Sequence, residues 1–212
     1  MLNIALPKGR LGVHVYRLLT KIGLDCPEIL EDNRKLVFEN KKNDVMYFLV
    51  KPSDVAIYVE NGAADIGVVG KDVLLESQPN VYELLDTGLG KCTISVAAPN
   101  GYRENPATVL RVATKYPHIA KEYYANMSRK IELIKLNGSI EIAPCVNLSD
   151  VIVDIVETGG TLKENNLSVT ANIKDISARL IANKSSYKFK NDRIAQVENL
   201  LREVISSENS QV

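Results

Sequence analysis

The stretch from Val151 to Leu162 combines apolar, acidic, threonine and glycine residues in an order that could form a ligand site. Residues 151–156 are apolar and mostly β-branched apart from Asp154, as in a buried parallel strand. A glycine pair between two threonines follows at residues 158–161, and residues 163–166 have the composition of a short helix. The pattern predicts a strand, a glycine turn and a helix, with any chemistry concentrated at the turn.

The turn offers two complementary kinds of group. The amides around Gly159 and Gly160 and the hydroxyls of Thr158 and Thr161 can donate to a phosphate at the start of a helix. The carboxylates just before them, Asp154 and Glu157, would be poor phosphate ligands but good acceptors for ribose hydroxyls. We therefore predict a site for a ribose 5-phosphate. A purely structural glycine turn remains the alternative, because short glycine motifs are common.

The elements that must position this turn follow an α/β pattern, since strand-like apolar runs alternate with amphipathic helical ones. In the first half we expect a helix that starts at Leu11 with helical apolar spacing and ends at Gly23. A second helix should start at Pro52-Ser53-Asp54 and end at Asn61-Gly62. The strands expected around these helices are residues 3–6, 47–50 and 65–70.

A second unit is predicted to begin near Gly88–Gly90. A helix is expected over residues 118–127, β-type alternation over 167–182, and an amphipathic helix around Ile194 and Leu201, with a polar tail at 206–212 that frays. The strand candidates are residues 92–98, 110–114, 131–136 and 151–155. We expect two lobes, residues 1–88 plus 180–212 and residues 89–179, with a ligand cleft between them.

Composition narrows the function classes. The 212 residues are 45% hydrophobic, and 26 basic side chains balance 26 acidic ones, so no global field favours nucleic acid or a membrane. Neither a signal-peptide pattern nor a membrane-length apolar run is present. The three cysteines are far apart and the two histidines lack companion ligands, which predicts a reducing cytoplasm and no structural zinc.

Several isolated charged residues could either bind a ligand or have only a structural or surface role. Lys8 and Arg10 follow the first strand, where α/β proteins bind ligands, although by position alone a solvated pair is slightly favoured. Arg34 is equally consistent with an anion contact and a surface charge. Glu141 stands at a predicted helix start, where interaction with the helix dipole is a sufficient explanation.

The segment D-I-V-E-T-G-G-T-L-K-E-N-N-L resembles the phosphoribosyl-pyrophosphate loop of phosphoribosyltransferases, and most closely that of the ATP phosphoribosyltransferase family. Ordered blocks extend the resemblance over nearly the whole chain and are more specific than one glycine loop. These blocks are residues 4–11, 51–54, 58–60, 64–70 with Asp72, and 138–141.

The resemblance implies a reaction and a fold. N1 of the adenine of ATP would be joined to phosphoribosyl pyrophosphate, giving N1-(5-phosphoribosyl)-ATP and pyrophosphate in the first step of histidine biosynthesis. Such a transfer needs Mg²⁺ and fixed cations rather than a covalent nucleophile. The implied fold is α/β and resembles the type II periplasmic binding proteins, with two lobes of mixed sheet and flanking helices and the active site in the interlobe cleft.

The resemblance also suggests roles for individual residues. Phosphoribosyl pyrophosphate would be bound by Asp154, Glu157, Thr158, Gly159, Gly160, Thr161 and Leu162. The catalytic cations would be Lys8, Arg10 and Lys51, which would act on the triphosphate and pyrophosphate groups. The ATP contacts would be Lys8, Arg10, Arg34, Gly70, Asp72 and Glu141. Lys51 departs from the arginine usual in the family and lacks its planar fork, whereas Asp65 is expected only to pack and cap.

The length of the chain resembles that of the short form of the family, which lacks a C-terminal regulatory domain. By this resemblance we expect a homodimer within a hetero-oligomer that contains a regulatory subunit resembling histidyl-tRNA synthetase. Two alternatives stay open: a phosphoribosyltransferase for another base, because the loop reports only the ribose phosphate, and a non-catalytic small-ligand-binding module.

Overall fold

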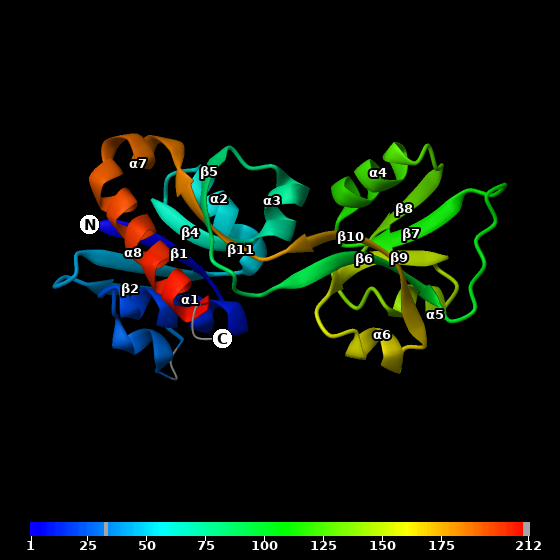
Figure 1. The fold of residues 1–212 in the computed structure, drawn as a ribbon, viewed down its shortest axis with the longest axis horizontal. Coiled ribbons are helices and arrows are strands. Elements are labelled where there is room, and N and C mark those ends of the chain that lie inside the picture. Colours follow the sequence, from blue (N-terminus) through cyan, green and yellow to red (C-terminus); the bar gives the residue numbers. More distant parts are fainter. Residues whose placement is uncertain (32–33, 210–212) are drawn as a thin grey trace. The chain divides into compact units, whose positions relative to one another are not determined.

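A computed structural model describes residues 1–31 and 34–209. The chain forms two compact units, each built on one mixed sheet with flanking helices (Figure 1). Unit 2 comprises Lys91–Ile176 and the short segment Leu75–Ser77, and unit 1 comprises the remainder. The predicted α/β architecture of two mixed sheets is confirmed, whereas the predicted ligand cleft stays a prediction.

The six-stranded sheet of unit 1 has the order β2-β3-β1-β4-β11-β5. Its three adjacent strands β3, β1 and β4 are parallel, so their carboxyl ends lie at one edge. The other strands run antiparallel to their neighbours. The bounds are β1 Leu2–Pro7, β2 Val37–Asn40, β3 Val45–Val50, β4 Ile66–Gly70, β5 Val81–Asp86 and β11 Ala178–Asn183.

Helices cover both faces of this sheet. The apolar sides of α1 (Arg10–Lys21) and α8 (Asn191–Asn209) pack on one face, where the two helices lie side by side (Figure 1). The opposite face is covered by α2 (Val55–Glu60), whose buried valines pack with Ile181. Each fully buried aliphatic side chain stabilises the fold by roughly 1.5–3 kcal/mol. The parallel strands β3, β1 and β4 are therefore held firmly by packing on both faces, which fixes the position of the residues at their carboxyl ends.

Asp65, just before β4, is a buried structural carboxylate. It is 4% exposed and accepts hydrogen bonds from the Asn3 amide at 2.8 Å and from the Ser186 hydroxyl and Lys190 ammonium at 2.7 Å each. Burial raises the pKa of Asp65, but these donors and the Lys190 charge together lower it below its ordinary value. Asp65 is structural, as predicted, but it acts through an ion pair and hydrogen bonds, and the residue that caps α7 (Lys184–Phe189) is Asn183.

The five-stranded sheet of unit 2 has the order β10-β6-β9-β7-β8. The strands β9, β7 and β8 are parallel, and β6 is antiparallel to β9 and β10. Helix α4 (Pro117–Asn126) covers one face, and the short helices α5 (Ile142–Cys145) and α6 (Gly160–Glu164) lie on the other. The strand bounds are β6 Cys92–Pro99, β7 Leu110–Thr114, β8 Ile131–Lys135, β9 Val151–Val156 and β10 Leu167–Ile176.

Some elements differ from the sequence-based expectations. The run predicted over residues 167–182 is two strands, because β10 ends at Ile176 in one sheet and β11 begins at Ala178 in the other. Of the tail predicted to fray, residues 206–209 continue helix α8, and residues 210–212 lie outside the described residues. Strands β2 and β5 were not predicted, since both are edge strands with few buried positions and therefore a weak apolar signal. The remaining elements comprise α3 (Lys71–Ser77), α7 (Lys184–Phe189) and the 3₁₀ turns Pro27–Leu30 and Pro52–Asp54.

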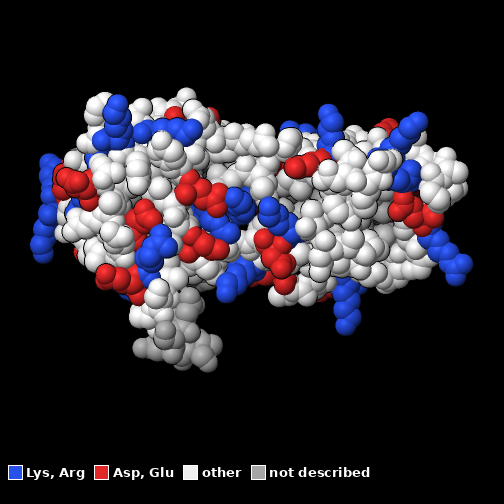
Figure 2. All heavy atoms as spheres, turned by 45° about the horizontal axis from the view of Figure 1, so that its top comes forward, with Lys and Arg blue, Asp and Glu red and all other residues white. Residues whose placement is uncertain are grey.

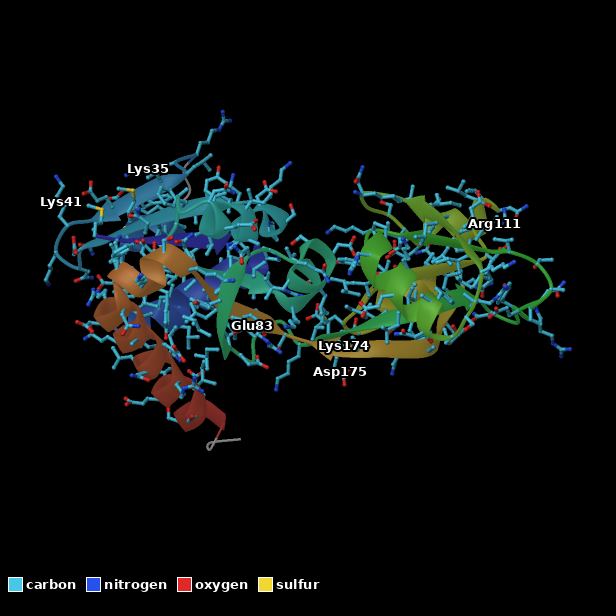
Figure 3. All side chains as sticks on the ribbon, turned by 90° about the horizontal axis from the view of Figure 1, so that it is seen from above. Lys35, Lys41, Glu83, Arg111, Lys174 and Asp175 are labelled. Atoms are coloured by element: carbon cyan, nitrogen blue, oxygen red, sulfur yellow. The ribbon has the colours of Figure 1, made fainter. Side chains whose placement is uncertain are left out.

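The surface reflects the balanced composition. On the face drawn in Figure 2, basic and acidic side chains are interspersed rather than gathered into one field. Glu83 on β5, labelled in Figure 3, accepts from Lys71 at 2.5 Å and from Arg179 at 2.9 Å, a local example of this pairing. Within residues 1–31 and 34–209, no helix has the length and apolarity needed to cross a bilayer.

Candidate functional site

Lys8 and Lys51 lie side by side at the carboxyl edge of the unit 1 sheet. Pro7 on β1 is in register with Val50 on β3, and the Lys8 amide donates to the Val50 carbonyl oxygen at 2.7 Å. The two lysines therefore follow neighbouring strands at the same level. Both are exposed, and neither forms an ion pair with the residues that the structure describes. Their charges are available to an anion.

Two glycines allow helix α1 to start at this edge. Gly9 has φ 91° and ψ −163°, a conformation that only glycine adopts readily. A Cβ on Gly12 would lie 1.7 Å from the Pro7 carbonyl oxygen, so the first turn of α1 rests directly on the end of β1. Arg10, exposed, is the first residue of that helix. Sequence analysis missed Gly12, although the repeat of glycine in G-R-L-G was an available signal.

Arg34 reaches the same edge from the neighbouring strand. Strand β2 is antiparallel to β3, and the Leu49 amide donates to the Leu36 carbonyl oxygen at 2.8 Å. The residues before Leu36 therefore run beside the residues after Leu49, which brings the Arg34 backbone toward Lys51. Arg34 is exposed, and its neighbours Asp32 and Asn33 lie outside the described residues.

Gly70 and Asp72 are held together where β4 meets α3. A Cβ on Gly70 would lie 2.1 Å from the Asp72 carboxylate oxygen Oδ1, so this carboxylate folds back over the Gly70 backbone. Because this oxygen is the end of a flexible side chain that can move aside, the close approach does not by itself require a glycine at position 70. Both residues are half-buried at the carboxyl end of the third parallel strand, and a nucleotide contact there stays a prediction.

The predicted phosphate turn lies at the carboxyl edge of the unit 2 sheet. Val151–Val153 are buried, whereas Thr158 and Thr161 are exposed. Gly159 has φ 74° and ψ 2°. The first backbone hydrogen bond of α6 runs from the Lys163 amide to the Gly159 carbonyl oxygen, at 3.1 Å. Because first-turn amides have no partner within a helix, those of residues 160–162 can donate to a ligand. Helix α6 has only five residues, so these amides matter more than its dipole.

Leu162 anchors the turn. Its side chain is 7% exposed and packs in the core cluster that includes Ile152 and Leu167. The side chain cannot meet a ligand, so the predicted binding role of Leu162 can involve only its amide. The apolar contact fixes the position of α6 on the sheet, and with it the direction of the three amides.

The two carboxylates flank the end of β9. Side chains alternate along a strand, so half-buried Asp154 shares the sheet face of Ile152, which is the face carrying α5 and α6. The Asp154 carboxylate oxygen Oδ1 accepts from the Ile155 amide at 2.8 Å. Glu157 is exposed at the entrance to the turn. The acids and the amides thus occupy one edge, as the ribose-phosphate interpretation requires.

Glu141 lies after β8, at the same edge. It immediately precedes α5, but its side chain makes no capping hydrogen bond, and α5 has only four residues. The dipole-capping explanation offered by the sequence is therefore weak. Ser139, two residues earlier, has φ 51°, an uncommon backbone conformation for a residue with a side chain.

A family model described as "HisG: ATP phosphoribosyltransferase" matches residues 51–204, which include the turn and both of its acids. The chain belongs to the ATP phosphoribosyltransferase family. A curated ATP phosphoribosyltransferase from Brachyspira hyodysenteriae is 63% identical over 206 residues, covering 97% of this chain and all of the relative. One from Clostridioides difficile is 51% identical, covering 96% of this chain and 98% of the relative.

Solved structures agree with this assignment. The ATP phosphoribosyl transferase (HisG:HisZ) complex from Thermotoga maritima contains a chain with TM-score 0.85 and 38% identity, covering 98% of this chain and 100% of that one. Tv2483 bound to L-arginine has TM-score 0.58 and 14% identity, covering 98% and 86%, and shows the fold alone. The predicted periplasmic-binding-protein-like fold is confirmed. So is the predicted function, that of an ATP phosphoribosyltransferase in the first step of histidine biosynthesis.

Proposed function

We propose that this ATP phosphoribosyltransferase holds the ribose 5-phosphate of phosphoribosyl pyrophosphate in the turn of residues 157–162. The observation that carries the proposal is the set of first-turn amides at residues 160–162, beside two exposed threonine hydroxyls and two carboxylates. The amides and hydroxyls bind the 5-phosphate. Asp154 and Glu157 accept the hydrogens of the ribose hydroxyls, and their negative charges favour the cationic sugar that forms as pyrophosphate departs.

The cations at the unit 1 edge act on the other phosphates. In the reaction, adenine N1 of ATP forms a bond to C1 of the ribose, and the bond from C1 to pyrophosphate breaks with its electron pair leaving on pyrophosphate. Lys8, Arg10 and Lys51 neutralise the triphosphate and this leaving group, which is catalysis by position and charge. Arg34, Gly70, Asp72 and Glu141 are the further ATP contacts that we propose.

Mg²⁺ fits this chemistry as a companion of the substrates. Among the described residues, no three His, Cys, Asp or Glu side chains gather as a metal site. Mg²⁺ is commonly bound through substrate phosphates with one or two carboxylates, and Asp154 and Glu157 are the acids beside the phosphate turn. When bound, the ion would supply positive charge to the pyrophosphate.

A regulatory partner and the cellular setting extend the proposal. The Thermotoga maritima relative was solved as a HisG:HisZ complex. We propose that this chain, too, works as a homodimer within a hetero-oligomer containing a regulatory subunit related to histidyl-tRNA synthetase. Cys26, Cys92 and Cys145 are all free thiols, which supports our assignment of the enzyme to a reducing cytoplasm.

The decisive experiment measures the adduct. The purified chain, with and without the regulatory subunit, is incubated with ATP, phosphoribosyl pyrophosphate and Mg²⁺, and N1-(5-phosphoribosyl)-ATP is followed by its absorbance. We expect adduct only when all three are present. Absence of adduct in both preparations would refute the proposal. Adduct with another base but not with ATP would indicate a different phosphoribosyltransferase, and binding without turnover would indicate a ligand-binding module.

A further inference from the structure

Lys115 follows the strand that lies between the phosphate turn and the loop of Glu141. Thr114, the last residue of β7, is in register with Val153 on β9 and with Lys135 on β8. The Leu136 amide also donates to the Thr114 carbonyl oxygen at 3.0 Å, so β7 and β8 end at one level, whereas β9 continues to Val156. Extended by one residue, the register of β7 and β9 places Lys115, the residue after β7, beside Asp154, the first acid of the turn.

The backbone at Lys115 is fixed on both sides. Thr114 is fully buried, and its hydroxyl donates to the Val153 carbonyl oxygen at 2.6 Å and accepts from the Tyr116 amide at 2.8 Å. Tyr116 is 3% exposed and packs in the core beneath α4. Lys115 is thus an exposed residue held between two buried ones, and its side chain leaves the sheet from a defined point.

The alternation of side chains determines the face on which Lys115 begins. Ala113, two residues earlier, packs in the cluster that contains Ile152 and Leu162. Residues two apart on a strand share a face. Lys115 is the first residue after β7, and we place the start of its side chain by the same alternation on the face of α5 and α6, where Asp154 and the phosphate turn also lie.

The charge of Lys115 is not neutralised by the protein. Its ammonium lies 5.7 Å from the centre of the Tyr116 ring, and it forms no ion pair within residues 1–31 and 34–209. The turn, by contrast, carries two carboxylates and no cation before Lys163, which lies in the last turn of α6. A doubly charged phosphate bound by neutral amides beside two acids requires a nearby counter-charge.

We infer that Lys115 is a binding residue for the 5-phosphate of phosphoribosyl pyrophosphate, completing the cradle formed by the amides of residues 160–162. The inference rests on the proposed function of the turn. It assigns the ammonium to the phosphate that stays on the ribose rather than to the pyrophosphate that leaves. Removing it should therefore affect phosphoribosyl pyrophosphate binding and leave ATP binding nearly unchanged.

The test compares Lys115→Met, Lys115→Arg and the control Lys121→Met in the complex with the regulatory subunit. Lys121 is an exposed lysine of α4, on the opposite face of the sheet. We expect Lys115→Met to raise the KM for phosphoribosyl pyrophosphate about tenfold or more, the effect of losing a charged hydrogen bond. The KM for ATP should change less than twofold, Lys115→Arg should recover part of the loss, and Lys121→Met should match the wild type.

Competitive inhibition distinguishes a contact with the 5-phosphate from a contact with the pyrophosphate. The inhibition constant of ribose 5-phosphate should rise with the KM for phosphoribosyl pyrophosphate, whereas that of inorganic pyrophosphate should stay constant. The inference is overturned if Lys115→Met leaves the KM for phosphoribosyl pyrophosphate within twofold of wild type, or if only pyrophosphate inhibition weakens. If the wild type is active and Lys115→Met has the same KM for phosphoribosyl pyrophosphate, only the role of Lys115 is rejected. If the wild type itself is inactive, the proposed function is rejected. Because Lys115 is exposed, thermal unfolding midpoints should agree among all four proteins.

Discussion

Gly12 of helix α1 lies so close to the end of β1 that a Cβ on it would come within 1.7 Å of the Pro7 carbonyl oxygen. This approach places the start of α1, and therefore Arg10, at the edge that carries Lys8 and Lys51. Relief of a backbone clash of this size requires the helix to move. Stability and the anion site should therefore change together.

Gly12→Ala should lower the free energy of unfolding by about 1–3 kcal/mol, the usual cost of overpacking, or more if α1 is displaced. The matched control is Gly138→Ala, because a Cβ there meets nothing within 4 Å and the backbone φ is not positive. It should change stability by less than about 0.5 kcal/mol. Urea unfolding followed by circular dichroism measures both, and equal values for the two variants would contradict the packing argument.

Lys51→Met should reduce kcat/KM for ATP and weaken inhibition by pyrophosphate roughly tenfold to a hundredfold, corresponding to about 1.5–3 kcal/mol for a bond to a charged group. Lys51→Arg should retain activity, because arginine keeps the charge and adds a planar fork. Lys41→Met is the control, since Lys41 is exposed in the β2–β3 hairpin, away from the carboxyl edge (Figure 3). Steady-state kinetics that show the same small effect for Lys51→Met and Lys41→Met would exclude a role in anion binding.

Thr161→Ala should weaken binding of phosphoribosyl pyrophosphate by roughly 1.5–3 kcal/mol, because one donor to a charged phosphate is lost. Its side chain is exposed, so the fold should persist. Isothermal titration with phosphoribosyl pyrophosphate tests this, with Thr108→Ala as a control in an exposed loop of the same unit. Unchanged affinity together with reduced stability would support the structural interpretation of the glycine turn.

Asp65→Asn should destabilise the protein by roughly 3 kcal/mol at neutral pH, because a nearly buried carboxylate loses its ion pair and charged hydrogen bonds. The pKa of Asp65 is lowered in the folded state, so its contribution is present above the unfolded pKa of about 4 and is lost as pH falls through the folded pKa. The difference between wild type and variant should therefore shrink as the pH falls below about 4.

Urea unfolding at several pH values measures this dependence. Asp175→Asn is a suitable comparison, since Asp175 is an exposed acid on β10 (Figure 3) whose carboxylate accepts from Thr93. A constant difference between wild type and Asp65→Asn over the whole pH range would contradict the ion-pair account.

Histidine should not inhibit the purified chain at concentrations that inhibit its complex with the regulatory subunit, because we assign the regulatory site to that partner. Initial rates at increasing histidine, for the chain alone and for the complex, test this. Potent inhibition of the chain alone would place a histidine site on this chain.

The amino-acid sequence determined the local features of this protein. The apolar run from Val151, the glycine pair at 159–160 and the apolar spacing of α1 are properties of neighbouring residues, and the structure has the strand, turn and helices that they predict. The ordered motifs also indicated the family, because their types and order are contained in the chain itself. The local secondary structure and the family motifs can both be predicted without knowing which distant residues are in contact.

The tertiary structure decided what depends on distant residues. The alternating run after residue 167 divides at Ser177 between two sheets, because strand partners are chosen by burial and hydrogen bonding along the whole chain. Leu162 belongs to the core rather than to a ligand because α6 packs on Ile152. Strand register likewise brings Lys8 beside Lys51 and Lys115 beside Asp154, neighbours that no pattern along the chain could reveal.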